Sequence, residues 1–284
     1  MNMDTPASYA FEKLMEGMYR YHDIRTPILG TSQSIRQITP ELLSLCHEAF
    51  YTPGNMVLTV VGDVDPEQVA QAAYKWLGTD LVPIGEKIPD RTEEMTCQEA
   101  YQEIRMDIAQ PDFQMAFKCE PIGNGTEGIR QEMIGDMAAE MLFGESSKLY
   151  LELYDKGVID TTFGGGFEAA DGCTFLTCGG ESKDPLTVRK AILERVRQLE
   201  QEGLEEAEFT RIKRSAMGQR IRHLDSADSV CFRLCAYHFS DFDYFRFPEI
   251  YETVTVEDVQ RFISKMVTEE RCGMVVVKPI EEEE

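Results

Sequence analysis

The sequence predicts an α+β fold built from a duplicated domain, with the first copy truncated at its N-terminus. The first observation is an internal repeat, because Ile38–Leu43 returns as Val254–Val259 and each copy opens a helix that runs into a β-branched strand. Upstream, Asp4–Phe11 parallels Asp225–Phe232. The second observation is the order of elements, in which strands joined by hairpins are followed by helices. This order is typical of an antiparallel sheet flanked by helices, mainly on one face.

The repeat also predicts where the chain divides. Residues 1–78 correspond to the C-terminal part of the first domain, and residues 99–284 correspond to a whole second domain. Residues 79–98 form the predicted linker, which is rich in proline and charge. Because the first copy has lost much of its sheet, we expect it to expose apolar surface. We therefore expect it to associate with another chain or to form a mobile N-terminal region.

The truncated copy should contain three helices and one strand. Residues 6–20 have amphipathic helical spacing. Thr39 is a good helix N-cap, and the helix that follows it should end near Tyr51. Residues 56–62 read as a strand, and residues 65–78 read as a capped helix that closes on glycine.

The second copy should begin with two strands at 99–108 and 112–120, followed by helices at 126–143 and 146–154. A glycine-rich hairpin is predicted over 161–180, with its turn at Asp171-Gly172. The remaining predicted elements are helices at 185–201, 205–223 and 226–238, and the repeat segment 254–277.

Composition limits the classes of partner and location. The net charge of −23 disfavours nucleic acid and anionic membranes as partners, because phosphate binding needs clustered Lys and Arg. No apolar run approaches the ~18 residues of a transmembrane helix, and the first residues do not resemble a signal peptide. The eight cysteines are irregularly spaced, mostly within apolar patterns, which suits reduced thiols in a cytoplasmic protein.

Motifs that would carry chemistry are few. The run Gly164–Gly166 lies inside a predicted hairpin, where a phosphate cradle would need a strand-to-helix turn. Cys231, Cys235 and His238 share one face of a predicted helix and could nominally bind zinc. Because large apolar side chains surround them and a fourth ligand is not evident, we favour buried structural residues over a metal site.

Several segments carry a family resemblance. They are PILGT at 27–31, FYTPGNMVL at 50–58, VGDVD at 61–65, FGESSKLY at 143–150 and LYDKG at 153–157. Together they resemble the pitrilysin/insulinase family of zinc metallopeptidases, and the chain is most similar to its bacterial processing-protease-like branch.

The resemblance implies two α+β domains that close like a clamshell around a peptide. In active members the first domain carries H-x-x-E-H, whose histidines bind zinc and whose glutamate is the general base. This sequence has no such motif, and the resemblance places it upstream of Met1. In the second copy the motif position reads DMAAE at 136–140, which lacks both histidines and the base. We expect no catalytic residue and no metal ligand in this chain, with zinc bound in the missing N-terminal part.

The resemblance also identifies candidate substrate-binding residues. Active members place an Arg and a Tyr of the second domain near the scissile bond. The Arg position is Tyr154 here, and the Tyr position falls at Asp160 or Thr161. These departures put help with catalysis in doubt. Tyr154 could line the chamber or simply pack within a helix.

The predicted function is that of the C-terminal portion of a zinc-dependent endopeptidase acting on peptides or unfolded chains. The chain would provide the chamber wall and sheet edges for extended backbone, and would be inactive by itself. The alternative is a non-catalytic subunit that pairs with an active homologous peptidase, and a third possibility is a binding domain without peptide chemistry. The expected partners are a polypeptide substrate and either the rest of the same peptidase or a homologous subunit.

Overall fold

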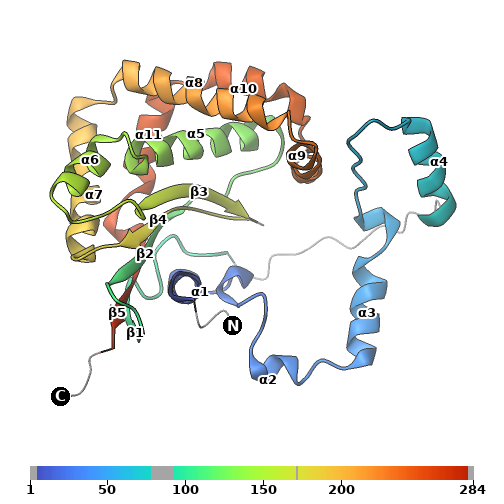
Figure 1. The fold of residues 1–284 in the computed structure, drawn as a ribbon, viewed down its shortest axis with the longest axis horizontal. Coiled ribbons are helices and arrows are strands. Elements are labelled where there is room, and N and C mark those ends of the chain that lie inside the picture. The colour runs from blue at the N-terminus through green and yellow to red at the C-terminus, as the bar shows by residue number, and fades with distance from the viewer. Residues whose placement is uncertain (1–4, 78–91, 171, 281–284) are drawn as a thin grey trace. The chain divides into compact units, whose positions relative to one another are not determined.

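The computed structural model describes residues 5–77, 92–170 and 172–280, which cluster into two compact units (Figure 1). Unit 1 comprises residues 1–26, 91–217 and 246–284, and unit 2 comprises residues 27–90 and 218–245. Most of the predicted linker, one residue of the predicted hairpin turn and the four C-terminal glutamates lie outside the described residues. The two units divide the chain by contacts, so they need not follow the copies of a repeat.

A five-stranded sheet forms the centre of unit 1 (Figure 1). Its strand order is β1-β5-β2-β4-β3, with β1 parallel to β5 and the other neighbours antiparallel. The strands are β1 (Tyr101–Met106), β2 (Asp112–Cys119), β3 (Gly164–Ala170), β4 (Cys173–Glu181) and β5 (Cys272–Pro279). This sheet, with its flanking helices, confirms the predicted α+β class.

Helices cover one face of this sheet (Figure 1). They include α5 (Gly125–Phe143), α6 (Lys148–Asp155), α7 (Pro185–Glu202), α10 (Phe247–Thr253), α11 (Val256–Met266) and the first part of α8 (Glu206–His223). The approach of α5 to β3 is close, since a Cβ atom on Gly135 would lie 2.5 Å from the Phe167 ring. Glycine at this helix position therefore lets the aromatic ring pack directly against the helix backbone.

The opposite face is covered by α1 (Pro6–Met18), the helix predicted from the first copy (Figure 1). Its apolar stripe packs on the sheet in one buried cluster, which contains Ala10, Leu14, Met15, Met18, Ala116, Phe175, Val275 and Val277. On β5, a Cβ atom at Gly273 would lie 2.5 Å from Cγ of Met18, so the helix sits almost against the strand backbone. The strands β2, β4 and β5 are thus covered on both faces, because α1 packs on the face that the other helices leave open.

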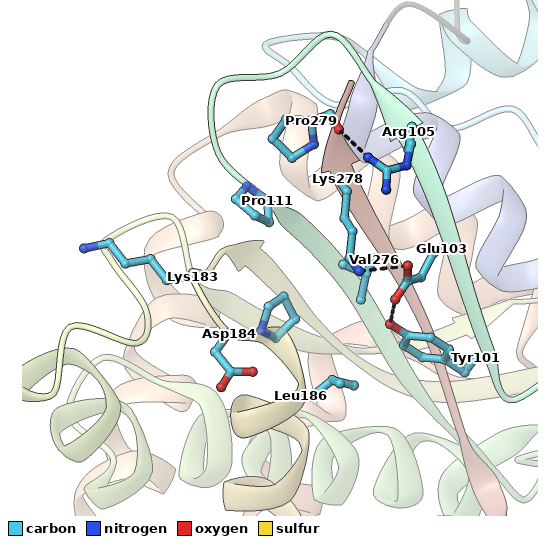
Figure 2. Close-up of a pocket in the computed structure, with 11 residues that line it drawn as sticks. Tyr101, Glu103, Arg105, Pro111, Lys183, Asp184, Leu186, Val276, Lys278 and Pro279 are labelled. Atoms are coloured by element: carbon cyan, nitrogen blue, oxygen red, sulfur yellow. Dashed lines mark hydrogen bonds and ion pairs between the residues drawn. The ribbon is translucent and has the colours of Figure 1, made fainter. Parts of the chain in front are cut away.

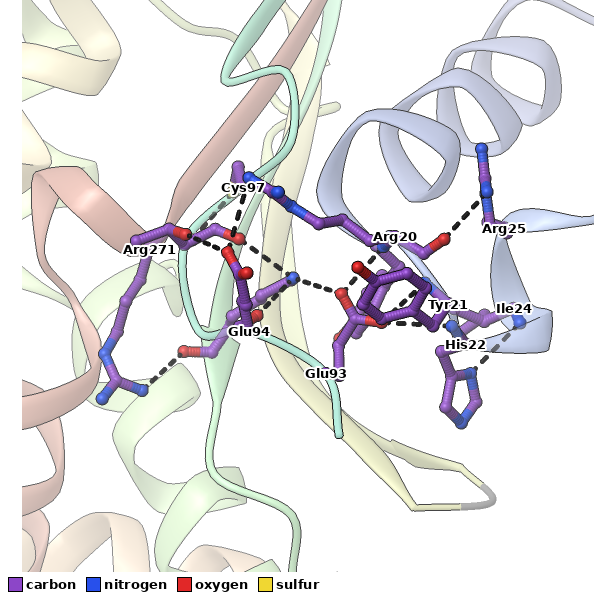
Figure 3. A network of polar contacts seen from close by, with 12 residues as sticks. Arg20, Tyr21, His22, Ile24, Arg25, Glu93, Glu94, Cys97 and Arg271 are labelled. Atoms are coloured by element: carbon purple, nitrogen blue, oxygen red, sulfur yellow. Dashed lines mark hydrogen bonds and ion pairs between the residues drawn. The ribbon is translucent and has the colours of Figure 1, made fainter. Parts of the chain in front are cut away.

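A buried polar network fixes the end of α1 (Figure 3). Lys118 on β2 is 1% exposed and donates to the Glu93 carboxylate at 3.2 Å and to the backbone oxygens of Glu94 and Thr96 at 2.8 and 3.2 Å. Burial lowers the pKa of Lys118, against the opposing effect of Glu93. The ammonium also lies 4.5 Å from the centroid of the Tyr19 ring.

The other side of the network holds the chain that follows α1 (Figure 3). The Glu93 carboxylate accepts hydrogen bonds from the backbone N–H groups of Arg20, Tyr21 and His22 at 2.8, 2.8 and 3.1 Å. Burial opposes ionisation of Glu93, yet these donors and Lys118 together hold its pKa below the ordinary value. One ion pair therefore connects β2, the segment after residue 91 and the end of α1.

Unit 2 is largely helical. It contains α2 (Ser32–Ile35), α3 (Pro40–Phe50), α4 (Pro66–Leu77), α9 (Ala227–Phe239) and the end of α8. The predicted cap is confirmed, because the Thr39 side chain accepts a hydrogen bond from the N–H of Leu42 at 3.2 Å. Many large apolar side chains of unit 2 are exposed, among them Ile28, Leu45 and Trp76.

The structure has no strand at residues 56–62, so the prediction of a strand there is wrong. The segment has no neighbouring strand among the described residues, and a strand needs ladder hydrogen bonds to a partner. Its residues still alternate in exposure, with Val57, Thr59 and Val61 half-buried. The local pattern of a strand is therefore present without the sheet that would complete it.

We expect Leu14→Ala to lower the free energy of unfolding of unit 1 by about 2–5 kcal/mol, because it empties a fully packed site between α1 and the sheet. Hydrogen exchange of amides in β2 and β5, with denaturant unfolding followed by circular dichroism, would measure the loss. Leu45→Ala on α3, where the side chain is 63% exposed, is the matched control and should change stability by less than about 0.5 kcal/mol. Equal effects of the two substitutions would contradict the packing described for α1.

Candidate functional site

The resemblance aligns the catalytic motif of active members with residues 136–140, which the structure places on α5. Residues 136–140 lie in its C-terminal half, where Met137, Ala138 and Ala139 are buried. Asp136 is half-buried and Glu140 is exposed, and one helical turn separates them. The residue that the resemblance aligns with the general base is Ala139, whose side chain cannot accept a proton. Among the described residues no group of three or more His, Cys, Asp or Glu side chains is arranged to hold a metal ion.

Tyr154 is presented by α6, next to α5. The helix begins at a Ser147 cap, whose hydroxyl accepts from the N–H of Tyr150 at 3.1 Å. The Tyr154 ring stacks on the Tyr150 ring at 5.8 Å with an interplanar angle of 11°, and Tyr150 in turn lies 6.1 Å from Phe163. Tyr154 is 45% exposed, so it offers an aromatic surface that is held from behind by buried rings.

Asp160 and Thr161 lie in the loop between α6 and β3. The Asp160 carboxylate accepts from the N–H and the hydroxyl of Thr162 at 2.8 and 2.6 Å, which is an Asx turn. The Thr162 hydroxyl also accepts from the N–H of Glu181 at 2.8 Å, so the loop is tied to the end of β4. Thr161 is exposed. The candidates identified from the resemblance are thus held by neighbouring elements, with Thr161 free to meet solvent.

A carboxylate that sequence reasoning missed lies beside this loop. Asp112 begins β2 and is paired with Glu181 in the ladder. Its Oδ1 atom is buried without a hydrogen-bond partner. Burial first, and then the charges of Glu181 and Asp160, raise the pKa of Asp112 to about 6. We call the carboxylates of Asp112, Asp160 and Glu181 the acidic rim. The register of β2 and β4 brings Asp112 beside Glu181, and the Thr162 contacts bring the Asp160 loop to the same end of β4.

The outer edge of the sheet near this rim is β3, which contains three consecutive glycines. A Cβ atom on Gly165 would lie 2.4 Å from the oxygen of Thr177 and 2.6 Å from the Phe143 ring, so packing requires this glycine. Cβ atoms on Gly164 and Gly166 would meet open space. On the face away from α5, no side chain therefore projects from positions 164 and 166 of this edge strand, and we call this part of β3 the smooth edge.

The cysteine and histidine residues of α9 do not form a metal centre. Cys231 donates to the oxygen of Thr59 at 3.2 Å, and Cys235 lies 2.7 Å from the Thr59 hydroxyl. Both thiols are half-buried, and His238 is exposed. These cysteines therefore act as contacts between α9 and the extended segment 56–61, close to the structural role favoured from the sequence.

Replacing Asp112 by Asn should stabilise the protein at neutral pH. The folded state holds the Asp112 proton more tightly than the unfolded chain, because its pKa of about 6 exceeds the ordinary 3.8. The free energy of unfolding therefore falls as the pH rises from 3.8 to about 6 and stays lower above it. Asp112→Asn removes this fall, because the amide carries no charge at any of these pH values. Allowing for solvent screening, we expect a gain of up to about 1–2 kcal/mol at pH 7 that shrinks towards pH 4. Urea unfolding across this range would measure it, with exposed Asp107→Asn as the control for charge loss.

This chain is similar in sequence to bacterial proteins over almost its whole length. Two curated relatives are the uncharacterized zinc protease YmfH of Bacillus subtilis, 33% identical over 97% of this chain, and the uncharacterized zinc protease Rv2782c of Mycobacterium tuberculosis, 23% identical over 98%. The chain spans 65% of the length of YmfH and 64% of the length of Rv2782c.

Solved structures show the same fold. A putative M16-like peptidase from Alicyclobacillus acidocaldarius superposes with a TM-score of 0.91 at 24% identity, covering 99% of this chain and 67% of that one. A protease from Helicobacter pylori superposes with a TM-score of 0.83 at 18% identity, covering 98% and 68%. The family description "Peptidase M16 inactive domain" matches residues 37–216. With the family resemblance of the sequence confirmed in this way, the chain belongs to the M16 peptidases and carries their inactive domain.

Proposed function

We propose that this chain is the non-catalytic portion of a zinc-dependent endopeptidase acting on peptides or unfolded chains, in which it forms a wall of the substrate chamber. Its membership of the family supports the proposal, as does the replacement of the base and both histidines on α5. The acidic rim and the net charge of −23 favour substrates with basic segments.

The observation that carries this proposal is the contrast between α1 and α9. By the repeat, α9 is the counterpart of α1, and Phe232 is the counterpart of Phe11. The Phe11 ring lies 6.2 Å from the ring of Phe175 on β4, whereas Phe232 is 72% exposed. Among the described residues, the ring of α1 thus packs on the sheet, whereas the ring of its counterpart on α9 is left exposed.

The extended segment of unit 2 supports the same conclusion. Its counterpart in the repeat is β5, which lies between β1 and β2 and is almost wholly buried. On one side of segment 56–61, the side chains of Met56, Leu58 and Val60 line an apolar groove of about 530 Å³ with α4. These side chains are 54%, 62% and 46% exposed. We infer that strands from outside this chain pair with the segment, supplied by the rest of the same peptidase.

The substrate surface that we propose is the smooth edge of β3 with the aromatic and acidic groups beside it. An edge strand offers unpaired N–H and C=O groups to an extended peptide, and Gly164 and Gly166 leave room for its side chains. Tyr154 would contact an apolar side chain, while Asp160 and Thr161 would offer polar contacts. These roles concern binding, because none of the three residues belongs to a metal or general-base site.

A cytoplasmic location is part of the proposal. All eight cysteines are free, which suits a reducing compartment. No helix among the described residues is long and apolar enough to cross a bilayer.

Cleavage assays test the proposal. We expect the 284-residue chain, supplied with zinc, to leave a fluorescence-quenched unfolded peptide uncut, because it has no general base at Ala139. The polypeptide with its upstream residues restored should cut the peptide, and a chelator should abolish this. Chelator-sensitive cleavage by the 284-residue chain alone would contradict the proposal. Cleavage that appears only on adding a homologous subunit would favour the alternative of a non-catalytic partner.

Binding variants test the proposed surface. Gly166→Val should leave the fold intact, since its Cβ enters open space, but should weaken binding of a labelled unfolded peptide roughly tenfold by filling the smooth face. Fluorescence anisotropy would measure the affinity. Gly123→Val, also at an open position but in the loop before α5, is the matched control. Equal affinity of both variants and the parent chain would exclude this face of β3 as the binding surface.

A further inference from the structure

An open groove lies between the helix α7 and the edge strand β1 (Figure 2). Its volume is about 410 Å³, and its lining includes Leu186 at the start of α7 and Tyr101 of β1. A second hollow of about 270 Å³ adjoins it along α7, and Leu186 lines both. No described strand lies beyond β1, so the layer of helices has an open side here. A groove between a helix and an uncovered edge strand can receive one more helix.

The exposed side of α7 along these hollows alternates cations with leucines. Four residues lie at intervals of four, three and four, namely Leu186, Lys190, Leu193 and Arg197. This spacing keeps them on one face of the helix, over about 16 Å of its length. Lys183 lies seven residues before Lys190, just before the helix begins, and extends the series. We call these five residues the α7 stripe.

The cations of the α7 stripe lack counter-charges. Lys183, Lys190 and Arg197 are exposed and make no ion pair or hydrogen bond with another described residue. Leu186, which lies between two of these cations, is 52% exposed. Three unpaired cations in line, on a chain whose net charge is −23, form a surface that is complementary to carboxylates and to apolar side chains together.

The other charges along the hollows are already matched. Glu103 accepts a hydrogen bond from Lys278 at 2.8 Å on the floor of the groove (Figure 2). Arg189 donates to Glu269 at 3.4 Å beside the second hollow. These pairs leave the α7 stripe as the part of the groove with an excess of positive charge.

The pattern distinguishes between possible partners. A second copy of α7 would bring cations against cations, which disfavours a symmetric pair through this face. An anionic bilayer would approach Glu194 and Glu269, which line the second hollow and would repel it. An acidic helix avoids both conflicts, because it can place carboxylates opposite the cations and apolar side chains opposite the leucines.

We propose that the α7 stripe and the groove beside β1 bind an acidic amphipathic helix of a partner protein. Carboxylates of this helix would meet Lys183, Lys190 and Arg197. Apolar side chains between them would pack on Leu186 and Leu193. About three helical turns of the partner would cover the stripe. This surface is separate from the smooth edge of β3, and the interaction requires neither zinc nor cleavage.

A synthetic helix of matching chemistry tests the surface. The probe is a labelled peptide of about 20 residues, mostly alanine, in which glutamate and leucine alternate every three or four residues along one face. We expect the 284-residue chain to bind it in fluorescence anisotropy at low salt. A peptide of the same composition in scrambled order should bind at least about tenfold more weakly, because its glutamates and leucines no longer share one face.

Substitutions on the α7 stripe should weaken binding of the probe. Lys190→Glu and Arg197→Glu should each raise the dissociation constant about tenfold, because a carboxylate then meets a carboxylate. Leu186→Ala should raise it about threefold through lost apolar contact. The double variant with both charge reversals should instead bind the matched peptide that carries lysine in place of glutamate. Circular dichroism would show that each variant keeps the fold.

Matched controls separate this surface from general effects of charge and of leucine loss. Arg214→Glu on α8 makes the same charge change at an exposed site that lines neither hollow. Leu151→Ala on α6 removes a side chain that is 50% exposed, close to the 52% of Leu186. Both variants should bind the probe as the parent chain does.

Three results would overturn the proposal. The first is a parent chain that binds the ordered peptide no better than the scrambled one. The second is equal affinity of the parent, Lys190→Glu and Arg197→Glu, because another surface would then hold the probe. The third is sedimentation of the parent, but not of Lys190→Glu, with phosphatidylserine vesicles in the absence of peptide binding, since the stripe would then be a membrane contact.

Discussion

The packing of α1 onto the second face of the sheet is the contact on which the rest of unit 1 depends. Without it, β2, β4 and β5 would expose an apolar face that the other helices do not reach. The buried Lys118–Glu93 pair fixes the end of this helix by joining β2 to the N–H groups of Arg20–His22. Removing one partner of such a pair leaves an uncompensated buried charge, which commonly costs about 3–5 kcal/mol.

This packing also brings together segments that lie far apart in the sequence. The helix α1, near the start of the described residues, covers one face of a sheet whose strands begin only at residue 101. In unit 2, the Phe232 ring is exposed, and segment 56–61 pairs with no strand among the described residues. In the function that we propose, these surfaces meet the rest of a peptidase, and the chain supplies a wall of its substrate chamber.

Local signals in the sequence predicted most of the elements. The Thr39 cap and the hairpin of β3 and β4 depend on residues close in the chain, and both occur as expected. The strand at 56–62 was predicted from the same kind of signal and is wrong here, because a strand is completed only by neighbours. The amphipathic pattern of α1 predicted that one face is buried, but it could not indicate which sheet would bury it. Asp112 was missed because Glu181 and Asp160 approach it only through strand register.

The most direct test of this account is the composition of the native species that contains this chain. An antibody against residues 99–284 would recover it from its own cells, and its intact mass, sequence and zinc content would be measured together. The account predicts an H-x-x-E-H motif and bound zinc in the recovered species, on the same polypeptide or on a tightly bound homologous subunit. A species of 32.3 kDa without the motif, zinc or a partner would contradict it.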